Sequence, residues 1–213
     1  MFQMPGHTLE TKLQIIQAAK TLFKEQNIIG VTMAQIAEVA RLGRATIYRY
    51  FRSKEEILAE VLQNESENIM LRLIEITKGA KTAAEKLKRY AVARTEAVQE
   101  FMEIYRKSLQ TRNLFSPRII NVFNNLLSKE LELLKSIFEE GIRTGEFGAF
   151  DAETAAEGII AALCGMEAIE FFGKLPKQWP KKTEKFLELI INGMKSLKKG
   201  RVENEEANED AAN

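Results

Sequence analysis

Hydrophobic residues recur at three- and four-residue spacing along most of this chain. In the first such segment, about residues 9–26, the apolar positions are Leu9, Leu13, Ile16, Ala19 and Phe23. This spacing puts one stripe of an α-helix against a core. Similar stripes predict helices near 54–78, 82–108, 117–144, 151–173 and 181–198. No segment alternates with period two long enough for a strand, so the pattern predicts an all-α fold of about nine helices.

Two shorter helices are predicted between the first helix and residue 54. Thr32 is a suitable N-cap for a helix through Val39, and a second helix covers about residues 44–50. Arg41, Leu42 and Gly43 form the turn between them. Ser53, followed three residues later by Glu56, is a capping box for the long helix that begins at residue 54. The inward positions of this segment are Ile36, Ala37, Leu42, Ile47 and Phe51.

Positive charge is concentrated in the same segment. The chain has 31 Lys and Arg against 30 Asp and Glu, a net charge of +1. Between Val39 and Lys54 there is no acid, and the bases are Arg41, Arg44, Arg49, Arg52 and Lys54. Such clustering is typical of a phosphate-binding surface. The alternative is a solvent-facing helical hairpin with a chance run of Arg, but tyrosines interleaved with arginines are poor solubilising residues.

Composition excludes several other classes of protein. With one Cys, no internal disulfide forms, as is usual in a reducing cytoplasm. One His and one Cys are too few for a structural zinc site, so we expect no metal and no cofactor. The most apolar stretch, residues 158–166, is about half of a membrane span, and no signal peptide is visible. We expect a soluble cytoplasmic protein with no membrane partner. Residues 200–213 hold five acids and little to bury, which predicts a disordered acidic tail.

Several short motifs occur in a characteristic order. They are IIQAAKTLF at 15–23, Thr32 with Ile36-Ala37, TIYRYF at 46–51, and KEEIL at 54–58. Together they resemble the DNA-binding domain of the TetR/AcrR family of bacterial transcriptional regulators, and EEGIRTGEF at 139–147 adds a looser similarity. The resemblance implies a helix-turn-helix domain at 1–52 and a larger helical domain at 53–199 that binds an effector and dimerises.

The resemblance also implies a DNA-binding site. Thr46, Tyr48 and Tyr50 match groove and phosphate contacts of the family, and Thr32 and Lys54 match phosphate contacts at helix starts. Three further residues, at variable positions that affect sequence preference, are Arg44, Ala45 and Arg49. For Tyr48 the alternative is a half-buried ring that braces two helices.

Two residues of the turn depart from the family pattern. Arg41 replaces a turn Gly, at a cost of about 1 kcal/mol if the residue must adopt a positive φ. Gly43 replaces the capping Ser, which weakens the cap by about a few tenths of a kcal/mol. We expect both changes to be tolerated and to alter base preference.

The remaining chain permits a dimer and a sensor. Small residues at 158, 161, 162, 165 and 168 would allow another helix to approach closely, and the last helix carries an apolar stripe. The alternative is that both stripes serve only an intrachain core. Glu103, Glu167 and Glu170 are either anchors for a cationic group or solvent-exposed. No pocket residues are assigned.

These features predict a ligand-responsive transcriptional regulator. It would be a homodimeric repressor that binds a palindromic operator in double-stranded DNA and is released by a small-molecule effector. One alternative is an architectural or adaptor protein without effector control. Another is a helical enzyme, although the single His lies at the N-terminus and no nucleophile–base pair is evident. We expect no enzymatic activity.

Overall fold

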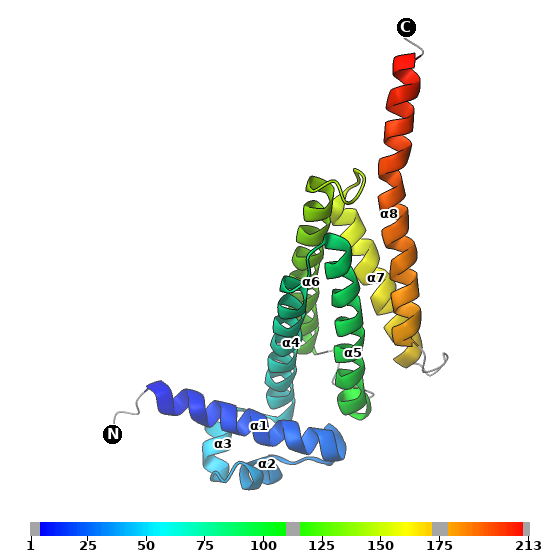
Figure 1. The fold of residues 1–213 in the computed structure, drawn as a ribbon. Coiled ribbons are helices and arrows are strands. Elements are labelled where there is room, and N and C mark those ends of the chain that lie inside the picture. Colours follow the sequence, from blue (N-terminus) through cyan, green and yellow to red (C-terminus); the bar gives the residue numbers. More distant parts are fainter. Residues whose placement is uncertain (1–4, 110–115, 172–178, 211–213) are drawn as a thin grey trace. The chain divides into compact units, whose positions relative to one another are not determined.

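The computed structural model describes residues 5–109, 116–171 and 179–210. These residues form eight α-helices and no strand, which confirms the all-α prediction (Figure 1). The helices are α1 (Pro5–Gly30), α2 (Met33–Val39), α3 (Arg44–Tyr50), α4 (Lys54–Lys78), α5 (Ala83–Leu109), α6 (Pro117–Arg143), α7 (Ala152–Phe171) and α8 (Trp179–Asp210).

The interior helices begin and end close to their predicted residues, whereas the terminal helices are longer. α1 extends the first predicted helix at both ends. α8 continues to Asp210, so its backbone is helical over 200–210, where the sequence predicts disorder. After Gly200 this stretch contains no further Gly or Pro, and most of its residues tolerate a helix. The disorder of the acidic tail in solution stays a prediction.

The chain divides into two compact units. The first comprises residues 1–68 and 100–125, and the second comprises residues 69–99 and 126–213. Helices α4, α5 and α6 therefore each contribute residues to both units. The 1–52 and 53–199 domain boundaries stay predictions.

The first unit has a core beneath the two short helices. Its largest fully buried side chains come from α1, from the α2–α3 segment and from the start of α4. They include Phe23, Ile36, Ile47, Phe51 and Ile57. The inward positions predicted from periodicity are thus buried, apart from Leu42, which is half-buried. α2 and α3 are thereby held by their apolar faces.

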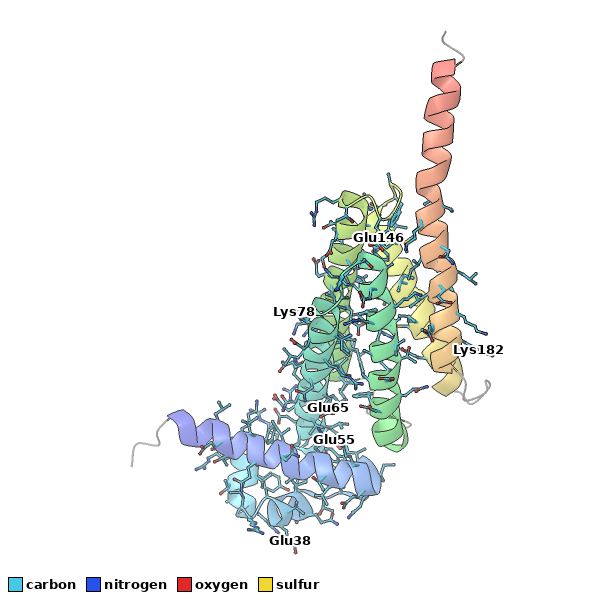
Figure 2. The ribbon with its side chains drawn as sticks, in the orientation of Figure 1. Glu38, Glu55, Glu65, Lys78, Glu146 and Lys182 are labelled. Atoms are coloured by element: carbon cyan, nitrogen blue, oxygen red, sulfur yellow. The ribbon has the colours of Figure 1, made fainter. Side chains whose placement is uncertain are left out.

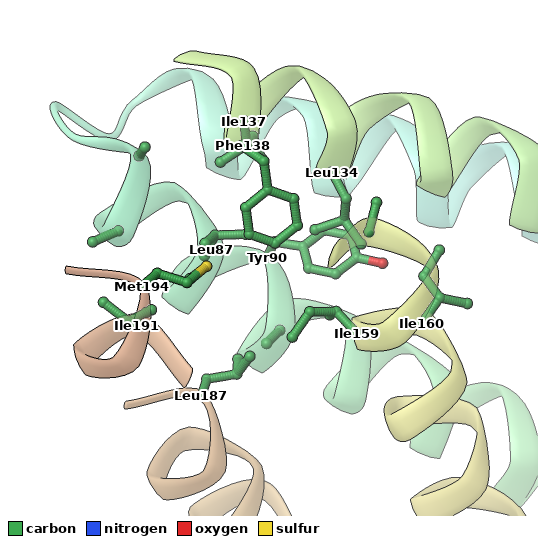
Figure 3. Packing of buried hydrophobic residues seen from close by; sticks show 14 of the residues in the cluster. Leu87, Tyr90, Leu134, Ile137, Phe138, Ile159, Ile160, Leu187, Ile191 and Met194 are labelled. Carbon is green, nitrogen blue, oxygen red and sulfur yellow. The ribbon is translucent and has the colours of Figure 1, made fainter. Parts of the chain in front are cut away.

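The second unit has its own core, drawn from α4 to α8. Tyr90 is fully buried among apolar side chains that include Leu87, Leu134 and Phe138 (Figure 3). Gly141 on α6 lies so close to Phe147 that an added Cβ would be 2.2 Å from the Phe147 Cδ2 atom. A glycine is required there by packing, and a side chain would displace a buried ring.

Among the described residues, no helix is both long enough and apolar enough to cross a membrane.

Candidate nucleic-acid interface

The α2–turn–α3 segment is held by local hydrogen bonds. Thr32 caps α2: its Oγ1 accepts from the Gln35 amide (3.3 Å), and the Thr32 amide donates to Gln35 Oε1 (2.8 Å). At the other end of α2, the amides of Arg41 and Leu42 donate to the carbonyls of Glu38 and Ala37. These hydrogen bonds satisfy backbone N–H and C=O groups at the ends of α2 that would otherwise have no partner within the helix.

Arg41 occupies the left-handed conformation of the turn. Its φ is 52°, and it is the one non-glycine residue in the described part of the chain with a positive φ. This confirms that the arginine stands where the backbone needs a glycine. Gly43 is the N-cap of α3 with φ −67° and ψ 146°, and it makes no side-chain cap hydrogen bond. The backbone at Gly43 is therefore open to any L-residue, and only the cap is lost.

α3 presents one polar face and buries the other. Ile47 is fully buried, and Phe51 follows it at 2% exposure. Tyr48 is 57% exposed, so it does not brace two helices as a half-buried ring. The structure leaves Arg44, Ala45 and Arg49 exposed and Thr46 and Tyr50 half-buried.

Arg49 and Tyr50 also contact each other. The Arg49 guanidinium lies 5.4 Å from the centre of the Tyr50 ring, a cation–π contact that restrains both side chains. Six predicted site residues, 44–46 and 48–50, are thus brought together on one short helix.

The two remaining predicted site residues make contacts within the molecule. The Lys54 ammonium donates to the backbone carbonyls of Ile29 (3.1 Å) and Val31 (2.9 Å). The Thr32 hydroxyl donates to Gln35 Oε1 at 2.8 Å. Both residues therefore brace the start of their own helix, and Lys54 ties α4 to the end of α1. The sequence predicted the Thr32 cap but not the Lys54 contacts, because nothing local identifies carbonyl partners more than twenty residues away.

Two acids close to α3 in the sequence, Glu38 and Glu56, differ in their surroundings. Glu38 is exposed on α2 and points away from α1 (Figure 2). Glu56 accepts from the Arg52 amide (2.8 Å) and from Arg118 Nη1 (2.8 Å). The backbone hydrogen bond from Arg52, followed by the Arg118 contact, lowers the pKa of Glu56 below its ordinary value. The negative charge of Glu56 is thus paired inside the first unit.

Of the three acids that the sequence suggests as anchors for a cationic group, the structure describes the side chain of one. Glu167 is half-buried and pairs with Arg94. The side chains of Glu103 and Glu170 lie outside the described residues. Within the described part of the chain, no group of three or more His, Cys, Asp or Glu could hold a metal ion.

Comparison with known proteins places this geometry in a family. A family model described as bacterial regulatory proteins, tetR family, matches residues 15–61. A second, described as the C-terminal region of QacR-like proteins, matches residues 52–196, more than half of the chain. The two matches overlap at residues 52–61, around the start of α4, and together span residues 15–196.

Individual relatives agree with the family models. The fatty acid metabolism regulator protein of Bacillus subtilis is 29% identical over 142 residues, which cover 63% of this chain and 69% of that protein. The transcriptional repressor KstR2 of Mycolicibacterium smegmatis is 22% identical, over 67% of this chain and 70% of its own length.

Solved structures share the fold. A transcriptional regulator from Cytophaga hutchinsonii has a TM-score of 0.73 and 22% identity, covering 89% of this chain and 97% of the other. The FadR regulator of Bacillus subtilis in complex with stearoyl-CoA has a TM-score of 0.66 and 24% identity, covering 85% and 98%. From the family matches and the exposed cationic helix α3, we conclude that this chain belongs to the TetR family of DNA-binding transcriptional regulators.

Proposed function

We propose that the chain is a homodimeric, ligand-responsive repressor that inserts α3 into the major groove of a palindromic operator. One observation carries this proposal: α3 exposes Arg44, Ala45, Tyr48 and Arg49 while Ile47 anchors it to the core. A helix reads bases only when its outward face offers donors and small contacts and its inward face is held firmly.

The polar residues of α3 and the small residue Ala45 divide into two roles. Arg44, Ala45 and Arg49 contact base edges and set sequence preference, and Thr46, Tyr48 and Tyr50 combine groove and phosphate contacts. Thr32 and Lys54 add phosphate contacts at the flanks. For Lys54, two of three ammonium protons are donated to Ile29 and Val31, so one remains for a phosphate. Phosphate contacts position the helix, and base contacts give specificity.

The first experiment replaces two side chains on the exposed face of α3. The operator is first selected from a random DNA library, where a dyad-symmetric site is expected. Replacing Tyr48 and Arg49 together with Ala should weaken operator binding by about a hundredfold or more, since each good base contact contributes about 1–3 kcal/mol. Both side chains are exposed, so the unfolding midpoint should not change.

Arg143→Ala is the matched control, because it removes the same charge from an exposed position at the end of α6. It should leave operator binding within about twofold. Unchanged affinity in the Tyr48/Arg49 double variant would refute the assignment of α3 as the reading helix.

Dimerisation is supported by exposed faces on α7 and α8. Ala161 and two glycines of α7, Gly158 and Gly165, are exposed, and a Cβ added to either glycine would meet no neighbour within 4 Å. On α8, Leu189 is 72% exposed and Leu197 53%. Exposed apolar residues beside small ones suit a helix–helix interface. Sedimentation should give the mass of a dimer, and Leu189→Glu should give a monomer; a monomeric parent chain would refute the proposal.

Effector control is supported by the helices that run through both units. α6 carries Arg118, which contacts Glu56 beside the reading helix, and continues into the core of the second unit. A ligand that shifts α6 in the second unit would change this contact. Couplings between such sites are typically about 1–3 kcal/mol. The relative that binds stearoyl-CoA is a regulator of the same fold.

The alternative is a DNA-binding architectural or adaptor protein without effector control. Ligand-induced release of the operator discriminates between the two. We also propose that the protein is cytoplasmic, since α3 can bind an operator only where DNA is accessible. We propose further that it is not an enzyme.

A further inference from the structure

Arg41, in the turn between α2 and α3, is held in a backbone conformation that arginine rarely adopts. Its φ is 52°. The Arg41 amide donates to the Glu38 carbonyl at 3.0 Å, and the next amide, of Leu42, donates to the Ala37 carbonyl at 2.9 Å. This pair of hydrogen bonds is a Schellman motif, in which the left-handed residue is usually glycine and sometimes asparagine. The end of α2 therefore imposes the left-handed conformation on whichever residue stands at position 41.

No contact within the described part of the chain accounts for the arginine side chain. Arg41 is exposed, and its guanidinium makes no hydrogen bond, ion pair or cation–π contact with the residues that the structure describes. Glu38, the acid nearest to it in the sequence, is exposed and is not paired with it. Glycine would fit the same backbone without the steric cost of a Cβ. Because strained residues gather at binding and switch sites, the arginine points to a contact outside the molecule.

Arg41 differs from the other bases of the segment in its position. The Lys54 ammonium is directed to backbone carbonyls, and the Arg49 guanidinium is restrained by the ring of Tyr50. Arg41 lies outside both helices, two residues before Gly43, the N-cap of α3. Consecutive Cα atoms are about 3.8 Å apart, so the Cα atoms of Arg41 and Gly43 are within about 8 Å of each other. An unpaired cation therefore flanks the start of α3.

The geometry of a helix-turn-helix decides what this cation can reach. When the second helix lies in the major groove, the first helix crosses the sugar–phosphate backbone. Arg41 ends that first helix, α2, and so lies on the side of the groove, whereas base edges face the outward surface of α3. A guanidinium binds phosphate oxygens through paired N–H donors. The partner that fits Arg41 is thus a phosphate of the duplex.

We propose that the Arg41 guanidinium binds a DNA phosphate at each half-site, a contact that the turn glycine of the family pattern cannot make. The inference rests on the proposed function, because it requires α3 to lie in the groove. Phosphate contacts position a helix without reading sequence. The arginine therefore changes the affinity and the salt dependence of operator binding, and not the base preference that the sequence suggested. The strain is kept because only a side chain can supply the charge.

The test measures operator affinity of the full-length protein at several salt concentrations. Each neutralised phosphate contributes about 0.9 to the slope of log K against log salt concentration. Arg41→Ala should make this slope shallower by about 0.9 per bound subunit, or about 1.8 for a dimer. Its affinity should be about tenfold or more below that of the parent at about 0.15 M salt, and the two should converge near about 1 M. An unchanged slope would overturn the proposal.

Two further substitutions separate the charge from the backbone strain. Arg41→Lys keeps the charge and the Cβ, so it should keep the slope of the parent chain. Arg41→Gly removes both, so it should bind the operator as weakly as Arg41→Ala while resisting urea better than the parent. A Lys variant with the slope of the Ala variant would overturn the assignment to charge. Loss of stability together with affinity in Arg41→Gly would show a structural role instead.

Operator variants distinguish a phosphate contact from a base contact. The loss caused by Arg41→Ala should be the same, within about twofold, on the selected operator and on operators with one base pair changed. A loss that depends on one particular base pair would mean that Arg41 reads a base, and it would overturn the phosphate assignment. Arg143→Ala removes the same charge from an exposed position at the end of α6 and should leave the slope unchanged.

Failure of this inference is distinguishable from failure of the proposed function. A parent chain that selects no operator, or a Tyr48/Arg49 double variant that binds as the parent does, would refute α3 as the reading helix and this inference with it. Operator binding that depends on Tyr48 and Arg49 but not on Arg41 would support the proposed function and refute the phosphate contact.

Discussion

The hypothesis that Arg41 is strained, because it stands where the family pattern has a turn glycine, can be tested quantitatively. Arg41 has φ 52°, a conformation that costs an L-residue about 1–2 kcal/mol. Glycine avoids that cost but loses about 0.5–1 kcal/mol more backbone entropy on folding. Arg41 is exposed, and its amide hydrogen bond to Glu38 is independent of the side chain. We therefore expect Arg41→Gly to stabilise the protein by about 0.5–1 kcal/mol.

The assay is urea unfolding followed by circular dichroism, with Arg41→Ala as the matched control. The Ala variant also loses the guanidinium but keeps the strained Cβ, so its stability should stay within about 0.5 kcal/mol of the parent. In thermal unfolding, the Gly variant should melt about 1–4 °C higher. If Arg41→Gly is no more stable than Arg41→Ala, strain at this turn is not what distinguishes it from the family pattern.

Two further predictions concern packing and the contact between α4 and α6. Gly141→Ala should destabilise the chain by about 1–3 kcal/mol, because its Cβ would overlap the buried Phe147 ring. Gly30→Ala is the control in the same urea titration, because a Cβ added at Gly30 would meet no neighbouring atom within 4 Å. An equal loss of stability in the two variants would contradict the packing argument. Arg118→Ala should cost less than about 1 kcal/mol at pH 7, since its ion pair with Glu56 is partly exposed. Because the pKa of Glu56 is lowered, the stability it contributes is present above its ordinary value of 4.5 and is lost as the pH falls through the lowered value. The difference in urea midpoint between parent and Arg118→Ala should therefore shrink on acidification, and a constant difference would show that the ion pair is not its cause.

Local patterns were sufficient for most of the fold and for the position of the exposed cationic helix α3. The apolar stripes predicted α4 with the observed bounds and the neighbouring helices within a few residues. The Thr32 cap, the turn at Arg41 and the buried Ile47 also follow from residues only a few positions apart. Helix periodicity and capping are properties of consecutive residues, so a single sequence contains them.

The partners of charged side chains depend on tertiary structure. The sequence shows Lys54 as a base beside a cationic helix, but the fold directs two of its protons to carbonyls at the end of α1. Glu56 could be recognised as a capping residue, but its ion pair with Arg118 requires α4 and α6 to meet.

The buried ion pairs of Arg94 with Glu130 and Glu167 are the clearest case. No spacing along α5, α6 or α7 identifies Arg94, Glu130 and Glu167 as neighbours, because each lies on a different helix. The sequence determined which segments are helical and where positive charge collects. Only the packing of those helices decided which charges are buried together. It also left Glu130 Oε1 without a donor among the residues that the structure describes. Contacts between helices depend on how whole faces fit rather than on neighbouring residues.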